Sequence, residues 1–243
     1  MSTAPNLADL PHLPATHDRG LKVFAAPVGG RNSVANLARE ALIAETARFR
    51  RGAAEARAHL PLPSQRSERI GEMSGAVVQK MRAAAKAYAE ENARVSNAAK
   101  LATAVPAYGD STAYYTVDQD SRLVDRLYNM EPTQRAALLG QTMKDPASNQ
   151  RLAEAILRQH PMLAGISPAE HDQLRMTMLK AMRPDVAFAL ETEQTQIAHL
   201  REALAVCGTE LREQAPGAWS EMQVVAPEVG SVLTAPTTEG EQQ

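Results

Sequence analysis

Residues 67–104 read SERIGEMSGAVVQKMRAAAKAYAEENARVSNAAKLATA, a long run without proline. Its alanine content favours a helix, because alanine loses no side-chain entropy on becoming helical. Apolar residues recur every seven positions on two adjoining rows, namely Ile70, Val77, Ala84 and Ala98, and Met81, Tyr88, Val95 and Ala102. Further apolar residues beside these rows make the stripe broader than a two-row coiled-coil seam. The pattern therefore predicts a helix that packs against more than one neighbour.

The segment before this helix predicts a second long helix antiparallel to it. Asn32 or Ser33 can cap a helix that runs to about His59, with a thin apolar face. The sequence LPLPS over residues 60–64 ends that helix, because proline cannot continue one. A connection this short places two helices side by side and antiparallel. Residues 32–105 are therefore predicted to form a long helical hairpin.

The residues that follow predict a smaller helical bundle over residues 106–214. Each expected helix has a start or stop signal, such as Pro132 in a first turn, Pro161 as a stop, and Ser167 with Glu170 as a capping box. The last helix of this bundle is predicted from about residue 184 to residue 213. It carries a seven-residue apolar row, Leu190, Ile197, Leu204 and Leu211, with Val186, Leu200 and Cys207 on the neighbouring row.

This heptad row has two interpretations. It can be a zipper that pairs two copies of the chain, or the core-facing stripe of a bundle within one chain. The flanking positions hold few of the charged pairs that select a coiled-coil partner, and Glu193 falls inside the seam. Intramolecular or lateral packing is the favoured interpretation, with a self-pairing coil as the alternative.

The two ends of the chain show no helical period. Residues 1–31 are rich in proline and glycine, and residues 215–243 hold four glutamates and no basic residue. Both are predicted to be extended or disordered arms. The fold class predicted from sequence is therefore all-α: a long antiparallel hairpin, a smaller bundle ending in the heptad helix, and an arm at each end.

Composition restricts the setting of the protein. The single Cys207 excludes an internal disulfide, and no apolar stretch approaches the ~20 residues of a membrane-spanning helix. The first residues lack the basic and apolar regions of a secretory signal. We therefore expect a cytoplasmic protein, or one inside a viral particle assembled there.

The sequence holds no pattern typical of catalysis. Glycine-rich phosphate loops, dinucleotide fingerprints and nucleophile elbows are missing, and no two of the six histidines have the four-residue spacing of a metal pair on a helix. Paired glutamates fall within ordinary helical charge patterns. We expect a protein that is not an enzyme and that carries no metal or cofactor.

Two features suggest contacts with partners. A cationic patch is predicted on the first helix at Arg48, Arg50, Arg51 and Arg57, where it can meet phosphate or an acidic protein. Glutamates interleave with these arginines, and no known nucleic-acid-binding motif accompanies them. The loop that holds Tyr108, Tyr114 and Tyr115 is either a small satellite core or an aromatic hot spot for a partner.

The preferred function is a non-enzymatic structural or interaction subunit of a larger assembly, either a homo-oligomer or a hetero-assembly. Long alanine-rich helices offer extended packing surfaces, and a bacteriophage particle is one setting that fits such a subunit. The alternative is a regulatory or nucleic-acid-associated adaptor that uses the basic hairpin over residues 48–100. Phosphate contacts would make binding by such an adaptor strongly dependent on salt.

Overall fold

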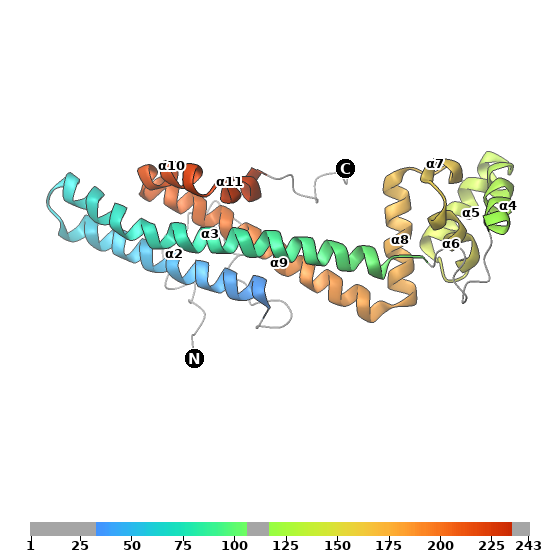
Figure 1. Ribbon diagram of the computed structural model, residues 1–243, viewed down its shortest axis with the longest axis horizontal. Helices are drawn as coiled ribbons and strands as arrows, with labels where there is room; N and C mark the ends of the chain where they lie inside the picture. Colours follow the sequence, from blue (N-terminus) through green and yellow to red (C-terminus); the bar gives the residue numbers. More distant parts are fainter. Residues whose placement is uncertain (1–32, 106–116, 235–243) are drawn as a thin grey trace. The chain divides into compact units, whose positions relative to one another are not determined.

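A computed structural model describes residues 33–105 and 117–234, and these residues form ten helices and no strands (Figure 1). The predicted all-α class is thus confirmed. The expected arm over residues 1–31 and the tyrosine loop with Tyr108, Tyr114 and Tyr115 lie outside the described residues. The helices are α2 (Val34–His59), α3 (Pro63–Ala102), α4 (Val117–Tyr128), α5 (Pro132–Lys144), α6 (Gln150–Arg158), α7 (Pro161–Ala164), α8 (Pro168–Met182), α9 (Pro184–Gln214), α10 (Pro216–Val225) and α11 (Pro227–Thr234).

Local signals in the sequence fix several of these boundaries. The hydroxyl of Ser33 accepts a hydrogen bond from the Asn36 backbone amide and caps α2. The Ser167 side chain accepts from the Glu170 amide while the Glu170 carboxylate accepts from the Ser167 amide, which completes the predicted capping box. α3 begins at Pro63, earlier than the predicted Ser67, because proline fits the first turn of a helix, where its missing N–H has no role.

The predicted extended C-terminal arm is wrong over most of its described length. Residues 216–225 and 227–234 form α10 and α11. Each helix begins at a proline and is too short to show an apolar period in the sequence. The apolar side chains of Met222, Val229 and Val232 are buried, and this tertiary contact stabilises helices that would be marginal alone.

Pro161 also acts differently from the prediction. It ends α6 as expected but opens the four-residue helix α7, with His160 as the cap. The sequence also suggests Asp145 as a cap with Pro146 in the first turn of a helix, but residues 146–149 form turns and α6 begins at Gln150. It suggests Asp118 or Asp120 as the cap of an earlier helix, and this is wrong because α4 already begins at Val117.

The chain divides into two compact units, and the division falls inside α3 and α9. The described part of the first unit comprises residues 33–95 and 192–234, so it is assembled from two separated stretches of chain. The second unit is the continuous stretch that begins at Ser96 and ends at Glu191. Each unit has its own cluster of buried apolar side chains.

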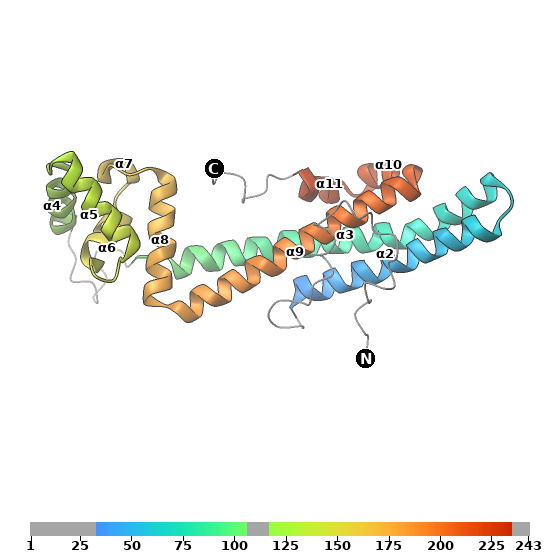
Figure 2. The ribbon, with the colours of Figure 1, turned by 180° about the vertical axis from the view of Figure 1, so that it is seen from behind.

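The first unit is built on three long helices. α2 and α3 run antiparallel as a hairpin, as predicted (Figures 1 and 2). α9 runs parallel to α2, because Thr46 pairs with Cys207 and Arg50 pairs with Glu210 at nearly the same offset along the chain. The shared core contains Leu42, Val77 and Met81 from the hairpin with Leu200, Leu204 and Leu211 from α9.

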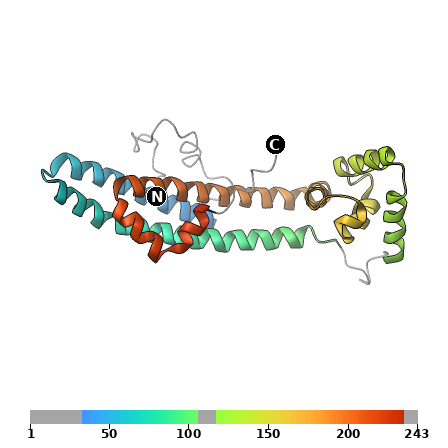
Figure 3. The same ribbon diagram turned by 90° about the horizontal axis from the view of Figure 1, so that it is seen from above.

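α10 and α11 turn back along α9 (Figure 3). Trp219 of α10 packs onto α9 at Gly208, beside Leu233 of α11. Arg201 donates a hydrogen bond to the Val232 carbonyl, and Arg82 of α3 pairs with Glu228 at 2.8 Å. These contacts close the first unit at its C-terminal end.

Replacing Gly208 with valine should displace α10. A β-carbon added at Gly208 would lie 3.0 Å from the Trp219 ring, and valine adds two further methyl groups there. Trp219 is the only tryptophan in the chain, so we expect a red shift of the intrinsic fluorescence in the folded protein. Gly75→Val is the matched control, because a β-carbon at Gly75 meets nothing within 4 Å. Equal spectra for the two variants would contradict the packing of Trp219 on Gly208.

The second unit is a compact group of shorter helices. α6 packs against α4, α5, α7 and α8, so it is the central element of this unit. Its core contains Leu127 from α4, Ile156 from α6 and Leu174 from α8, all buried. None of the helices within residues 33–105 and 117–234 combines the length and the apolar character needed to cross a bilayer.

Candidate interaction surfaces

The residues predicted to mediate helix packing lie inside the units. The structure buries nine of the ten and leaves Tyr88 partly buried against the first core. The heptad row therefore meets other helices of its own chain, which is the geometry of the favoured intramolecular interpretation. The buried nine are Ile70, Val77, Met81, Val95, Leu190, Ile197, Leu200, Leu204 and Leu211.

Polar side chains form a row between α2 and α9 in the first unit. Arg39 lies 3.4 Å from His199, the Thr46 hydroxyl donates to the Cys207 sulfur at 2.9 Å, and Arg50 pairs with Glu210. Burial raises the pKa of the Cys207 thiol to about 12 and raises the pKa of the Glu210 carboxyl as well. A protonated, inaccessible thiol is a poor nucleophile, so this row fixes the register of two helices rather than forming a reactive site.

The four predicted arginines do not form one cationic patch. Arg50 points inward to Glu210, and Arg48 pairs with Glu45 at 2.6 Å on the exposed surface. Arg51 and Arg57 are exposed, but Arg57 lies near enough to Glu210 to offset part of the rise in pKa that burial causes in that carboxyl. Arg50 and Arg57 are seven residues apart and lie on similar azimuths of α2, but Arg50 contacts α9 whereas Arg57 is exposed.

The basic hairpin meets acidic residues of the same chain. Residues 33–95 hold eleven Lys and Arg against seven Glu, and residues 192–234 hold two Arg against six Glu. Three ion pairs join these stretches: Arg50 with Glu210, Arg82 with Glu228, and Arg94 with Glu193. The charge asymmetry seen along the sequence is thus largely neutralised within the first unit.

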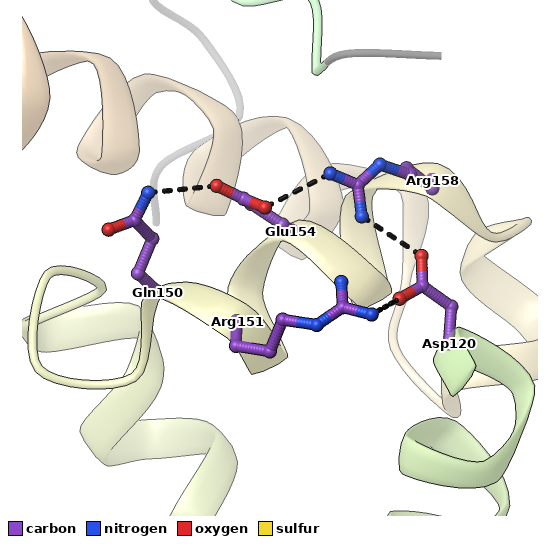
Figure 4. Close-up of polar contacts among 5 residues, drawn as sticks. All are labelled: Asp120, Gln150, Arg151, Glu154 and Arg158. Carbon is purple, nitrogen blue, oxygen red and sulfur yellow. Dashed lines mark hydrogen bonds and ion pairs between the residues drawn. The ribbon is translucent and has the colours of Figure 1, made fainter. Parts of the chain in front are cut away.

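The second unit holds a buried charge network between α4 and α6 (Figure 4). The Asp120 carboxylate lies 2.5 Å from Arg151 and 3.0 Å from Arg158. Arg158 also contacts Glu154 at 3.0 Å, and the Gln150 amide donates to Glu154 at 2.9 Å. Two carboxylates face two guanidinium groups, so the network is electrically balanced.

This balance argues for a structural role of the network. Arginine stays protonated at all accessible pH values, and both carboxylates already accept charge-assisted hydrogen bonds. Both carboxylates are buried, so they lack the open approach that a general acid or base needs. Among the described residues no group of three or more His, Cys, Asp and Glu side chains is arranged to hold a metal ion.

His171 of α8 is a buried histidine that lies beside α6. Burial lowers the pKa of its ring, and the nearby Arg175 lowers it further, although the backbone of Ile156 and Leu157 in α6 favours the protonated form. A folded-state pKa below the ordinary value of 6.5 means that the unfolded chain binds the proton more readily. The contribution of this ring to stability is therefore present above pH 6.5 and is lost as the pH falls below it.

We expect the second unit to be less stable at pH 5.5 than at pH 7.5 for this reason. His171→Phe keeps the buried ring and removes the titration, so it should flatten the dependence over that interval. The measurement is amide hydrogen exchange within residues 117–182 at both pH values, corrected for intrinsic exchange. His59→Phe is the control, because that ring is exposed at the end of α2 in the first unit. The same slope in wild type and His171→Phe would contradict the assignment.

α7 presents two apolar side chains to solvent. Met162 and Leu163 are 76% and 60% exposed, although they adjoin Ala164 and Ile166, which are buried in the second core. The His160 side chain accepts a hydrogen bond from the Met162 amide, and Gly165 adopts a left-handed conformation with φ 71° that ends the helix. The capped helix α7 thus holds the backbone of Met162 and Leu163 in a conformation that turns both side chains to solvent.

Sequence reasoning missed both the α7 pair and the charge network. The charges at Arg151, Glu154 and Arg158 share one face of a helix, which was a readable signal. Their partner Asp120 comes from another helix, and only the fold shows that contact. Met162 and Leu163 follow a proline that was interpreted as a helix stop, so no pattern in the sequence indicated that they would be exposed.

No family model, curated protein or solved structure matches this chain. Its function therefore has to be argued from its own surfaces.

Proposed function

We propose that this protein is a non-enzymatic interaction subunit of a larger protein assembly. The observation that supports the proposal best is the Met162–Leu163 pair of α7, which is exposed on a helix that is capped at both ends. Large apolar side chains that face solvent on an ordered backbone are hydrated unfavourably in the free protein. This free-energy cost is removed when a partner covers them. Methionine is also adaptable in shape and is common at binding surfaces.

The interior of the second unit supports the same proposal. The buried network around Asp120 and Arg158 and the core around Ile156 fix α6, and α6 packs against α7. A binding surface on such a scaffold loses little backbone entropy on association, because the helix that carries it is already formed. In the first unit the heptad residues Leu200, Leu204 and Leu211 are already covered by other helices of the same chain.

Site-specific photo-cross-linking tests the proposal. A photoreactive residue at Met162 in the full-length chain, expressed in its native host, should form a cross-link to one defined protein. The matched control is the same residue at Gln173, an exposed position on α8. Met162→Asp with Leu163→Asp should abolish co-purification of that protein while the circular dichroism spectrum stays unchanged. Equal labelling from both positions, or no cross-linked protein, would overturn the proposal.

The alternative, a nucleic-acid-associated adaptor, has less support. Arg50, Arg82 and Arg94 are engaged by glutamates of α9 and α11, and these pairs compete with phosphate. Retention of duplex DNA or RNA at low salt, with a steep loss on adding salt, would favour the adaptor instead. The bacteriophage particle stays a prediction about setting, and mass spectrometry of purified particles tests it.

A further inference from the structure

The outer face of α3 in the first unit carries a pattern that is complementary to itself. Ala83, Lys86, Glu90 and Ala93 follow spacings of three, four and three residues, so they form one stripe along the helix. All four are exposed, with the side chains of Lys86 and Glu90 76% and 65% accessible. The core residues Val77, Ala84 and Val95 lie on the opposite side of α3. We call these four residues the α3 outer stripe.

From its first to its last residue the α3 outer stripe reads Ala, Lys, Glu, Ala. In the opposite direction it reads Ala, Glu, Lys, Ala, so only the two charges change places. If two copies of α3 lie antiparallel about a two-fold axis level with Tyr88, Ala83 meets Ala93 of the second copy. Lys86 then meets Glu90 of the second copy, and the symmetry repeats each contact. A two-fold interface requires such self-complementarity, since the same surface serves on both sides.

The surface beside the α3 outer stripe is concave. An open groove of about 940 Å³ runs between α3 and α11, and its walls include Ala83, Lys86, Ala89 and Ala93 from α3 with Ser231 and Val232 from α11. Alanine side chains allow two helix axes to approach to the short end of the usual range of about 8–10 Å. The groove can therefore receive side chains of a second helix that lies close to α3.

We propose that two copies of this chain pair antiparallel through the α3 outer stripe, with the second α3 lying along the groove beside α11. The proposal rests on the charge pattern and the concave surface, and it is independent of the α7 pair. By the same two-fold relation, Arg94 would approach Arg82 of the second copy. Arg94 already pairs with Glu91 at 2.8 Å and with Glu193 at 3.2 Å, and Arg82 pairs with Glu228 at 2.8 Å, so both charges are partly neutralised within each copy.

The expected dimer is weak. Exposed Lys–Glu pairs contribute little, and alanines bury little area, so the complex belongs to the class of small, transient interfaces. Within one copy Lys86 lies 3.8 Å from Glu90, a distance that leaves both groups able to take a second partner. Electrostatic complementarity here selects the partner and its direction more than it adds affinity.

Charge reversal on the full-length chain tests the pairing by sedimentation equilibrium at low salt. Lys86→Glu puts like charges opposite each other at two symmetric places, and Glu90→Lys does the same. Each single variant should weaken the dimer at least about tenfold, because like-charge contacts across an interface are strongly unfavourable. The double variant K86E/E90K restores opposite charges and should return the dissociation constant to near wild type. An equimolar mixture of the two single variants should also pair, since each supplies the charge that the other needs.

A wild-type protein that stays monomeric over the accessible concentrations would overturn the proposal. The proposal also fails if the single reversals leave the dimer dissociation constant unchanged, or if K86E/E90K does not restore it. Circular dichroism checks the fold, which should be unchanged because the pair within one helix contributes only about 0.2–0.5 kcal/mol. Failure here leaves the cross-linking result at Met162 unaffected, because the two surfaces share no residue.

Cysteine cross-linking gives a second, geometric test. Ala83→Cys mixed with Ala93→Cys should form a disulfide dimer under mild oxidation, since these positions face each other. Either variant alone should not, because two copies of position 83 lie ten residues apart along the helix, about 15 Å, beyond the reach of a disulfide. Cys207 is buried and its thiol has a pKa of about 12, so it does not compete. Equal cross-linking of the mixture and the single variants would contradict the antiparallel arrangement.

Discussion

Replacing Arg158 with methionine should destabilise the second unit by about 3–5 kcal/mol, the usual cost of removing one partner from a buried ion pair. Methionine fills a similar volume, so the loss comes from electrostatics rather than from a cavity. Asp120 and Glu154, both buried, would each lose a guanidinium contact at 3.0 Å. The measurement is the protection of amide hydrogens in residues 117–182, which reports this unit separately from the other.

Arg122→Met is the matched control for this prediction. Arg122 also pairs with an aspartate, Asp118, at 2.9 Å, but both side chains are exposed. Such a pair contributes about 0.5 kcal/mol or less. A second variant combines Arg158→Met with Asp120→Asn and Glu154→Gln, which removes the orphaned charges and should recover part of the loss. An Arg158→Met effect no larger than that of Arg122→Met would show that the network adds nothing.

Leu204→Ala should destabilise the first unit by about 2–5 kcal/mol, through lost burial and the cavity that remains. Leu204 has no exposed surface and lies in the core formed by the hairpin and α9. Urea denaturation followed by Trp219 fluorescence measures the change, because Trp219 packs against the same core.

Leu62→Ala is the control for this second prediction. Leu62 lies in the connection between α2 and α3 and is 54% exposed, so the same chemical change should cost well under 1 kcal/mol there. Similar midpoints for both variants would mean that α9 does not pack into the hairpin. The expected difference therefore tests the intramolecular role of the heptad row directly.

Much of the fold could be predicted because its signals are local. Ser33 and Ser167 cap helices through their own hydroxyls, and the prolines at 132, 168 and 184 begin helices wherever they sit in the chain. The broad stripe on α3 indicated several neighbours, and α3 packs into a core shared with α2 and α9. These features need only a few consecutive residues or a regular spacing.

What could not be predicted depends on contacts between distant residues. α10 and α11 carry too few turns to show a period, and they are stabilised by packing on Gly208 and by the pair between Arg82 and Glu228. The exposure of Met162 follows from the direction in which α7 leaves the second core. The sequence indicates on which side of α2 Arg50 lies, but its partner Glu210 is 160 positions away along the chain.

The discontinuous first unit has a consequence for how the protein is made. As the chain leaves the ribosome, the hairpin appears with its apolar stripe uncovered and with four more basic than acidic residues over 33–95. The second unit is continuous and can fold once residues up to Glu191 have left the ribosome. The glutamates and leucines that complete the hairpin arrive only with residues 192–234. Helices α9, α10 and α11 thus complete the core that α2 and α3 begin, and a chain that stops before residue 192 would leave the apolar face of the hairpin uncovered.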